Sequence, residues 1–132
     1  RYPDPDEEAD LLGRTVGDHP IEALEPVTDR ATLIAARKTV STVQVAEPVR
    51  EYVTRLAAYT REHAHIGVSP RGSISLLRAA QARAAANGRE YVLPDDVQIE
   101  APVVMSHRIK TTDRDRDGDT VVDDALERVP VE

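Results

Sequence analysis

The stretch Gly67-Val68-Ser69-Pro70-Arg71-Gly72-Ser73 decides the fold, because it opens a helix whose two ends are both marked in the sequence. Ser69 is a favoured capping residue, Pro70 fits the first helical turn, and Asn87-Gly88 is a strong stop signal. Helical spacing predicts one apolar side, made by Ile74, Leu77, Ala80 and Ala84. The opposite edge is predicted to carry Arg71, Ser75, Arg78 and Ala82.

Helical spacing recurs on both sides of this segment. Upstream, Thr28 or Asp29 can cap a helix whose apolar stripe includes Leu33, Ala36 and Val40. The next helix is expected to begin near Glu47-Pro48, since proline suits the first helical position. Its apolar stripe is formed by Val49, Tyr52, Val53, Leu56 and Tyr59. These residues recur three or four positions apart, which predicts a second buried helix face.

Downstream, Pro94-Asp95-Asp96 opens a fourth helix, in which Pro102 predicts a kink or an early break near Ala101. The β-rich residues 42–45 and Tyr91-Val92 predict very short strands or extended connectors. The fold class is therefore all-α, a small bundle of about four main helices with one or two very short strands.

Both ends of the chain are predicted to carry a short helix. An acidic helix is expected from Asp6 to Leu12, before Gly13. Near the C-terminus, Val122, Ala125, Leu126 and Val129 have the spacing of a docked helix. The chain opens at Arg1 without a Met, which we interpret as an excised piece or a processed product.

The composition limits the classes of partner. The formal net charge is −7, from 24 acidic and 17 basic side chains. An acidic surface argues against non-specific binding of nucleic acid or of anionic membranes, which depends on phosphate neutralisation. The absence of cysteine excludes disulfides, thiolate nucleophiles and cysteine zinc sites. No stretch has the length of a membrane span, and no signal-peptide pattern opens the chain.

Residues 67–73 resemble the GASPR signature of the lid domain of MoxR-type AAA+ ATPases, a family related to magnesium-chelatase ATPase subunits. The similarity continues through Leu76–Ala80, Asn87-Gly88-Arg89, Tyr91-Val92, Pro94–Val97 and Ser106–Ile109. Upstream, Tyr2–Pro5 and Asp18–Val27 resemble the family's link between ATPase core and lid. The chain departs from the family pattern at Arg1 and at Val68, where Ala is common.

The resemblance implies three regions. Residues 1–27 would connect from the end of an AAA+ core that the chain lacks, residues 28–110 would form the lid, and residues 111–132 an acidic linker with a short C-terminal helix. It also implies ATP and Mg²⁺, held mainly by that core, and a homo-oligomeric ring, expected to be a hexamer. The family further implies a cytoplasmic chaperone-like ATPase that matures client proteins, with partners that carry von Willebrand A domains.

By the same resemblance Arg71 is the sensor-2 arginine, a catalytic and ATP-binding residue, with Ser69 and Arg78 as further nucleotide contacts. A guanidinium is always charged and offers a planar fork of donors, which suits phosphate oxygens. Phosphoryl transfer needs cations near the charge that develops on the γ-phosphate. The alternative for Arg71 is a surface ion pair with an acidic neighbour. For Arg78 the alternative is a salt bridge within the lid or a solvent-exposed side chain.

The chain contains no phosphate-loop motif and no strand that ends in paired acids for Mg²⁺. We therefore expect the segment alone to be inactive, although the intact protein would hydrolyse ATP. The alternative function is a nucleotide-independent helical interaction module, either an adaptor or a histone-like bundle. A phosphate loop about one domain upstream of Arg1 would decide between the two.

Other patterns are weaker. The acidic residues from Asp113 to Asp117, with Asp124, resemble part of a calcium loop, but an Asp in the last position and the residue spacing favour a solvated charge run. His63 and His65 lack a third ligand at local spacing, so no metal is predicted there. The acidic pairs Glu7-Glu8 and Asp95-Asp96 lie at helix starts, where the helix dipole explains them. Serines 69, 73 and 75 are better explained as helix-edge residues than as nucleophiles.

Overall fold

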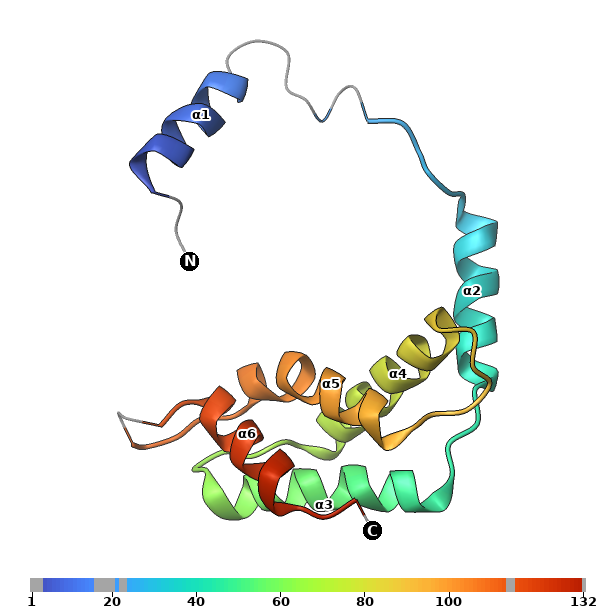
Figure 1. Ribbon diagram of the computed structural model, residues 1–132, viewed down its shortest axis with the longest axis vertical. Helices are drawn as coiled ribbons and strands as arrows, with labels where there is room; N and C mark the ends of the chain where they lie inside the picture. Colours follow the sequence, from blue (N-terminus) through green and yellow to red (C-terminus); the bar gives the residue numbers. More distant parts are fainter. Residues whose placement is uncertain (1–3, 16–20, 22–23, 114–115, 132) are drawn as a thin grey trace. The chain divides into compact units, whose positions relative to one another are not determined.

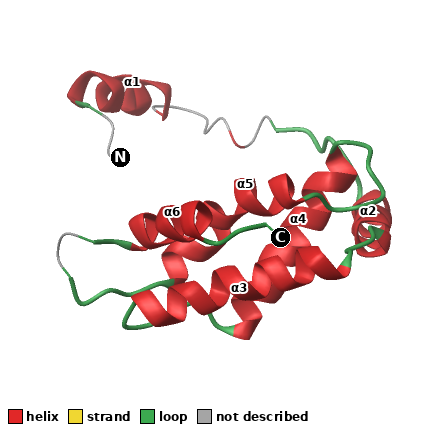
Figure 2. Cartoon of the chain, turned by 60° about the horizontal axis from the view of Figure 1, so that its bottom comes forward, coloured by secondary structure: helices red, strands yellow, loops and turns green. Residues whose placement is uncertain are grey.

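A computed structural model describes residues 4–15, 21, 24–113 and 116–131. In this part of the chain α-helices alternate with loops and no strand is present (Figure 2). The helices are α1 (Pro5–Thr15), α2 (Arg30–Thr42), α3 (Glu47–His63), α4 (Pro70–Ala86), α5 (Pro94–Met105), the 3-10 helix η2 (Ser106–Arg108) and α6 (Gly118–Arg128) (Figure 1). The prediction of an all-α fold is confirmed.

The chain divides into two compact units, Arg1–Leu33 and Ile34–Glu132. The first unit contains α1 and the first turn of α2. In α1, Asp4 caps the helix by accepting a 2.9 Å hydrogen bond from the backbone N–H of Glu7. The helix continues through Gly13 to Thr15, so it is longer than the predicted acidic helix.

Helix α2 is capped by Asp29, whose carboxylate accepts a 2.7 Å hydrogen bond from the Thr32 backbone N–H. This bond and one from the Thr32 side chain lower the pKa of Asp29. The cap is one of the two predicted from the sequence, but the predicted apolar stripe is not buried. Leu33 and Ala36 are exposed and Val40 is only partly covered, because no described helix packs along this side of α2.

The second unit has its core among α3, α4, α5 and α6. Helix α4 packs against α5, and α3 packs against α4 and α6. The buried side chains of α3 are Val49, Tyr52, Val53, Leu56, Ala57 and Thr60, which confirms its predicted stripe except that Tyr59 is half-buried. Helix α6 contributes Val121, Val122 and Ala125 to the same core. The predicted tail helix is thus present and docked, but Leu126 is only half-buried and Val129 lies just beyond the helix end. Burial of the apolar face of α6 is the main force that holds it there.

The buried face of α4 differs from the predicted one. It consists of Gly72, Leu76, Ala80 and Ala84, which repeat every four residues. Ala80 and Ala84 were predicted correctly, but Ile74 is 53% exposed and Leu77 only half-buried. Small residues at three of the four buried positions let neighbouring helices approach the α4 backbone closely. For this reason the side with the small residues faces the core, and the side with the bulkier Ile74 does not.

The two segments predicted as short strands or extended connectors meet in one isolated parallel bridge, between Gln44 and Tyr91. A second isolated bridge, between Ile66 and Lys110 in antiparallel orientation, was not predicted. In the second pair each backbone N–H donates to the other residue's carbonyl at 2.9 Å. These bridges satisfy loop backbone groups and join the connectors on either side of the core.

Pro102 does not break its helix. Helix α5 begins at Pro94, as predicted, and continues past Ala101 to Met105. Proline removes only one hydrogen-bond donor, and both Ala101 and Met105 are fully buried in the core on either side of it. Tertiary packing therefore outweighs the local preference for an early end.

Candidate functional site

The loop before α4 is held by two consecutive residues of α3. The hydroxyl of Thr60, which is fully buried, accepts a 2.9 Å hydrogen bond from the Val68 backbone N–H. The Nε of Arg61 donates to the Val68 carbonyl at 3.0 Å. Both backbone groups of Val68 are thus satisfied from α3, and the Val68 side chain is fully buried. This arrangement sets where α4 begins.

Two glycines of this segment are required by close approach. A Cβ atom on Gly67 would lie 2.5 Å from the backbone of Arg61, which has no room to move. A Cβ atom on Gly72 would lie 2.6 Å from Cγ1 of Val68 and 3.3 Å from Cδ of Arg108. The glycine and valine positions of the motif therefore pack the first turn of α4 against α3 and η2.

Arg71 is held on the solvent side of this turn. Arg71 is exposed, whereas the next residue, Gly72, is buried. Its backbone carbonyl accepts a 3.0 Å hydrogen bond from the Ser75 hydroxyl. No carboxylate of the described residues lies within 4.0 Å of its guanidinium. The surface ion pair considered for Arg71 is therefore absent from the part of the chain that the structure covers.

Ser69 occupies the N-cap position of α4 but makes no side-chain cap hydrogen bond. The prediction is right about the position and wrong about the bond. Its backbone carbonyl accepts from the Ser73 N–H at 3.1 Å, and its side chain is exposed. The hydroxyl is therefore available to a partner.

Arg71 and Arg78 lie on one exposed edge of α4. The exposed residues of this helix are Pro70, Arg71, Ile74, Arg78, Ala82 and Ala86. Arg78, like Arg71, has no ion-pair partner among the described carboxylates. Helix α4 itself contains no acidic residue, although the chain as a whole is acidic. We call this edge, from Arg71 to Ala82, the arginine edge of α4.

The other end of α4 carries a neutralised charge cluster. Arg89 binds the buried carboxylate of Asp96 with two hydrogen bonds of 2.7 and 2.6 Å. Asp96 also accepts a 2.8 Å bond from the Leu93 N–H at the start of α5. Arg83 of α4 donates to Glu100 of α5 at 3.1 Å. These contacts, which we call the α4–α5 clasp, join the two helices.

The clasp explains the ionisation of Asp96. Hydrogen bonds from Arg89 lower the pKa of Asp96 despite its burial, with smaller contributions from the Leu93 N–H and the Arg83 charge. The same bond raises the pKa of Arg89. The sequence placed Asp95-Asp96 at a helix start, which is confirmed, but it did not indicate the partner Arg89. A signal was available, because the carboxylate lies seven residues after the arginine across a single turn.

The remaining candidate residues have structural partners. Asp117 caps α6 by accepting a 2.9 Å bond from the Thr120 N–H, and hydrogen bonds from Thr120 lower its pKa. Asp124 pairs with Arg116. Two of the carboxylates of the calcium-like segment are therefore occupied, while Asp115 lies outside the described residues.

The histidines at the end of α3 do not assemble a metal centre. The His63 ring stacks on Tyr59, with ring centroids 3.9 Å apart, and its Nδ1 lies 2.9 Å from the Tyr59 carbonyl oxygen. Within the described ranges, no three His, Asp or Glu side chains are placed to hold a metal ion. Nor does that part of the chain hold a helix long and apolar enough to cross a membrane.

Residues 56–129 match the family model of the AAA lid domain. This chain belongs to that family. The match spans the loop that holds Arg71, the clasp and α6. It confirms the resemblance seen in residues 67–73 and the motifs that follow them.

Relatives agree with this assignment. The chain is 43% identical over 110 residues to the uncharacterized protein YeaC of Bacillus subtilis, covering 82% of this chain and 34% of that protein. It is 30% identical over 122 residues to the chaperone MoxR1 of Mycobacterium tuberculosis, covering 84% and 32%. A 43-residue stretch, 33% of this chain, is 58% identical to the protein MoxR of Paracoccus denitrificans, of which it covers 13%.

The fold also matches a solved structure. A candidate ATPase from Cytophaga hutchinsonii superposes with a TM-score of 0.78 at 24% identity, covering 98% of this chain and 44% of that one. This likeness shows the fold. This chain covers about a third of the length of YeaC and of MoxR1, and 44% of the matched structure.

Proposed function

We propose that this lid closes over ATP bound by a separate AAA+ core domain, with Arg71 as the residue that senses the γ-phosphate. The observation that carries the proposal is the state of Arg71. Its guanidinium is exposed and has no carboxylate partner among the described residues, while the turn that bears it is fixed by Thr60, Arg61 and Gly72. A fixed backbone with a free cation is the arrangement that a phosphate contact needs.

The residues of the lid fit a phosphate chain but not a metal ion. Arg71 and Arg78 offer planar donor groups that suit phosphate oxygens, and the Ser69 hydroxyl at the start of α4 is a further donor. The described part of the lid presents no cluster of carboxylates for Mg²⁺. We therefore assign Mg²⁺, the attacking water and the bulk of nucleotide binding to the core domain, and expect the lid alone to be inactive.

In this proposal Arg71 contributes to catalysis through charge. A guanidinium near the γ-phosphate stabilises the negative charge that accumulates there in the transition state. Arg78 lies two turns later on the same edge and contacts either the nucleotide or the core. Because the first turn of α4 packs against α3 and η2, a movement of Arg71 toward phosphate is expected to carry the bundle with it. Lid closure would then follow nucleotide state.

The proposal extends to the whole protein. We infer an oligomeric ring, expected to be a hexamer, in which ATP hydrolysis drives chaperone-like maturation of client proteins in the cytoplasm. The chaperone name of MoxR1 supports this inference. Partners with von Willebrand A domains and residues 1–27 as the link to the core remain part of the same proposal.

The test is Arg71→Ala in the intact protein. We expect ATP hydrolysis to fall by about two orders of magnitude or more, since removal of one transition-state charge contact costs on the order of 3 kcal/mol. The thermal midpoint should not change, because the exposed guanidinium holds nothing in the described part of the fold.

The matched control is Arg128→Ala, which removes an exposed arginine without an ion pair from α6. It should retain normal hydrolysis. Wild-type turnover by Arg71→Ala, measured as kcat under saturating ATP, would remove Arg71 from the mechanism. That result would favour the alternative function, a helical interaction module, since such a module requires no nucleotide.

A further inference from the structure

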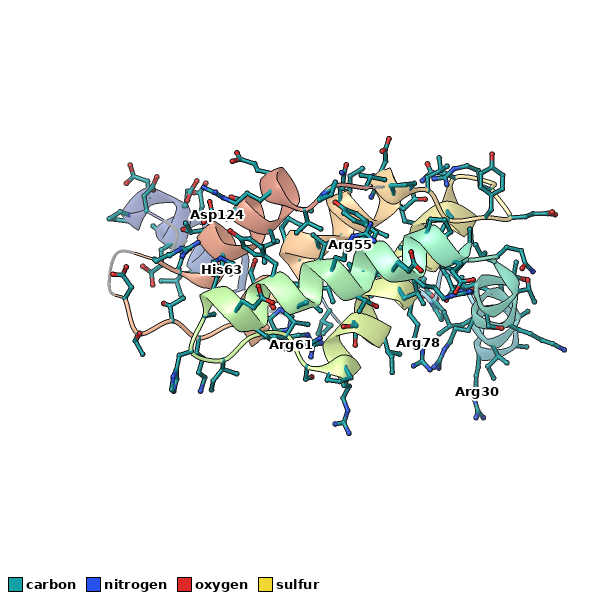
Figure 3. All side chains as sticks on the ribbon, turned by 90° about the horizontal axis from the view of Figure 1, so that it is seen from below. Arg30, Arg55, Arg61, His63, Arg78 and Asp124 are labelled. Carbon is teal, nitrogen blue, oxygen red and sulfur yellow. The ribbon has the colours of Figure 1, made fainter. Side chains whose placement is uncertain are left out.

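Two more arginines flank the turn that carries Arg71. Arg61, near the end of α3, donates its Nε to the Val68 carbonyl at 3.0 Å. Arg108, in η2, donates its Nε to the Val104 carbonyl at 2.8 Å, and its Cδ lies 3.3 Å from the Cβ position of Gly72. The two side chains thus approach residues 68–72 from different elements. Figure 3 shows Arg61 on the same side of α3 as Arg78, whereas Arg55 lies on the other side.

The anchoring is the same in both. Each arginine is fixed through its Nε, which leaves the terminal guanidinium nitrogens without a hydrogen bond to the described residues. Both residues are exposed, and neither has a carboxylate within 4.0 Å in that part of the chain. A guanidinium has five N–H donors, so each one keeps its terminal donors free for a ligand.

Five other arginines, Arg50, Arg55, Arg83, Arg89 and Arg116, are each paired with a carboxylate. Arg30, Arg37, Arg78 and Arg128 are also without an ion pair in the described part of the chain, but no hydrogen bond there joins them to residues 68–72. Arg61 contacts Val68 and Arg108 lies against the Cβ position of Gly72, so both side chains pack on the segment that carries Arg71. A multivalent anion bound at this segment would satisfy the free donors of these arginines.

We propose that Arg61 and Arg108 form with Arg71 a three-arginine cluster that binds the phosphate chain of the nucleotide. The inference deepens the proposed function and rests on it, because it takes ATP as the ligand of this turn. Arg71 supplies the contact that changes with hydrolysis, while Arg61 and Arg108 hold the chain of phosphates. A neutral or singly charged ligand would leave the cluster largely unsatisfied, so the class of ligand is a polyphosphate.

The test separates charge from packing. Methionine in place of either arginine keeps an unbranched apolar stem, which for Arg108 preserves the cover over Gly72. It removes the guanidinium together with its Nε hydrogen bond to Val68 or Val104, so the thermal midpoint of each variant is measured beside its affinity. The binding of ATP and of AMP to the intact protein is measured by calorimetry for Arg61→Met, Arg108→Met and the control Arg128→Met. We expect the ATP dissociation constant to rise about tenfold for each of the first two, equivalent to one charge-assisted hydrogen bond. AMP binding should change less than twofold, and Arg128→Met should bind both as wild type does.

Each result decides. ATP affinity within twofold of wild type in both variants, with an unchanged thermal midpoint, overturns the cluster. Equal weakening of ATP and AMP together with a lowered midpoint also overturns it, since the arginines would then only stabilise the fold. Arg71→Ala in the same series distinguishes the sensor role of Arg71 from the phosphate-binding cluster. Normal hydrolysis by that variant defeats the sensor role, whereas normal ATP binding by Arg61→Met and Arg108→Met defeats the cluster alone.

Discussion

The two ends of α4 carry arginines in opposite electrostatic situations. At its last turns Arg83 donates to Glu100, and beyond them Arg89 binds the buried Asp96. Arg71 in its first turn and Arg78 at its middle meet no carboxylate in the described part of the chain. Arginine therefore has two roles along this helix, and the presence or absence of a carboxylate partner determines which role each arginine has. Paired arginines hold α4 to α5, while the unpaired ones are available to a ligand outside the lid.

The contrast predicts that substitutions at the two ends of α4 affect different properties, the free energy of unfolding at one end and ATP hydrolysis at the other. A change at the clasp should lower the free energy of unfolding and affect hydrolysis only through loss of fold. A change on the arginine edge should do the reverse.

Asp96→Asn should have the largest effect on stability. The substitution removes the charge that faces Arg89 and leaves a mostly covered guanidinium, 24% exposed, without its anion. Breaking one side of a buried ion pair costs roughly 3 kcal/mol. Urea denaturation of the chain should show this loss, with Asp95→Asn as the control, since Asp95 is exposed and should change the value by less than about 0.5 kcal/mol. Equal stability of the two variants would show that the clasp does not hold α5.

Much of this fold could be predicted from the sequence, because helix ends carry local signals. Asp29, Pro70, Asn87-Gly88 and Pro94 mark ends that the structure confirms. The error on Ile74 has a different origin. Its exposure depends on Val68 and Arg108 packing onto Gly72, a contact between three elements that helical periodicity does not contain.

The site shows the same division. The motif alone placed Arg71 at the first turn of α4, and the structure puts it there, exposed. The residues that fix that turn could not be inferred, since Thr60 and Arg61 act on Val68 from the end of another helix. Arg61 and Arg108 were missed for this reason. Only the matched series through Ser106–Ile109 hinted that residue 108 belongs with the motif.

A matched pair of arginine substitutions sharpens the comparison within α4. Arg83→Ala should destabilise the chain by about 0.5 to 1 kcal/mol, a value kept low because the Arg83 side chain is 35% exposed and solvent screens its pair with Glu100. Arg78→Ala should change stability by less than about 0.5 kcal/mol, since it removes no contact and alanine favours a helix. Thermal unfolding of both variants measures the difference. Equal losses would mean that Arg78 also has a structural partner.

The smallest expected effect is the pH dependence of the clasp. The pKa of Asp96 is lowered from its ordinary 3.8 in the folded lid, chiefly by the hydrogen bonds from Arg89. A carboxyl with a lowered pKa stabilises the fold fully above its unfolded pKa, and that stability disappears as the pH falls through the folded pKa. At pH 3.8 the unfolded carboxyl is half protonated, so at most about 0.4 kcal/mol should be lost, and more as the pH falls further. The stability difference between wild type and Asp96→Asn, measured in urea from pH 6 to pH 3, isolates this contribution from the other carboxyls. This difference should stay level down to about pH 5 and narrow below pH 4.

A difference that stays constant to pH 3 would mean that the Arg89 contact does not favour the charged form of Asp96. The clasp would then owe its strength to packing between α4 and α5, and the electrostatic contrast between the two ends of α4 would lose one of its halves.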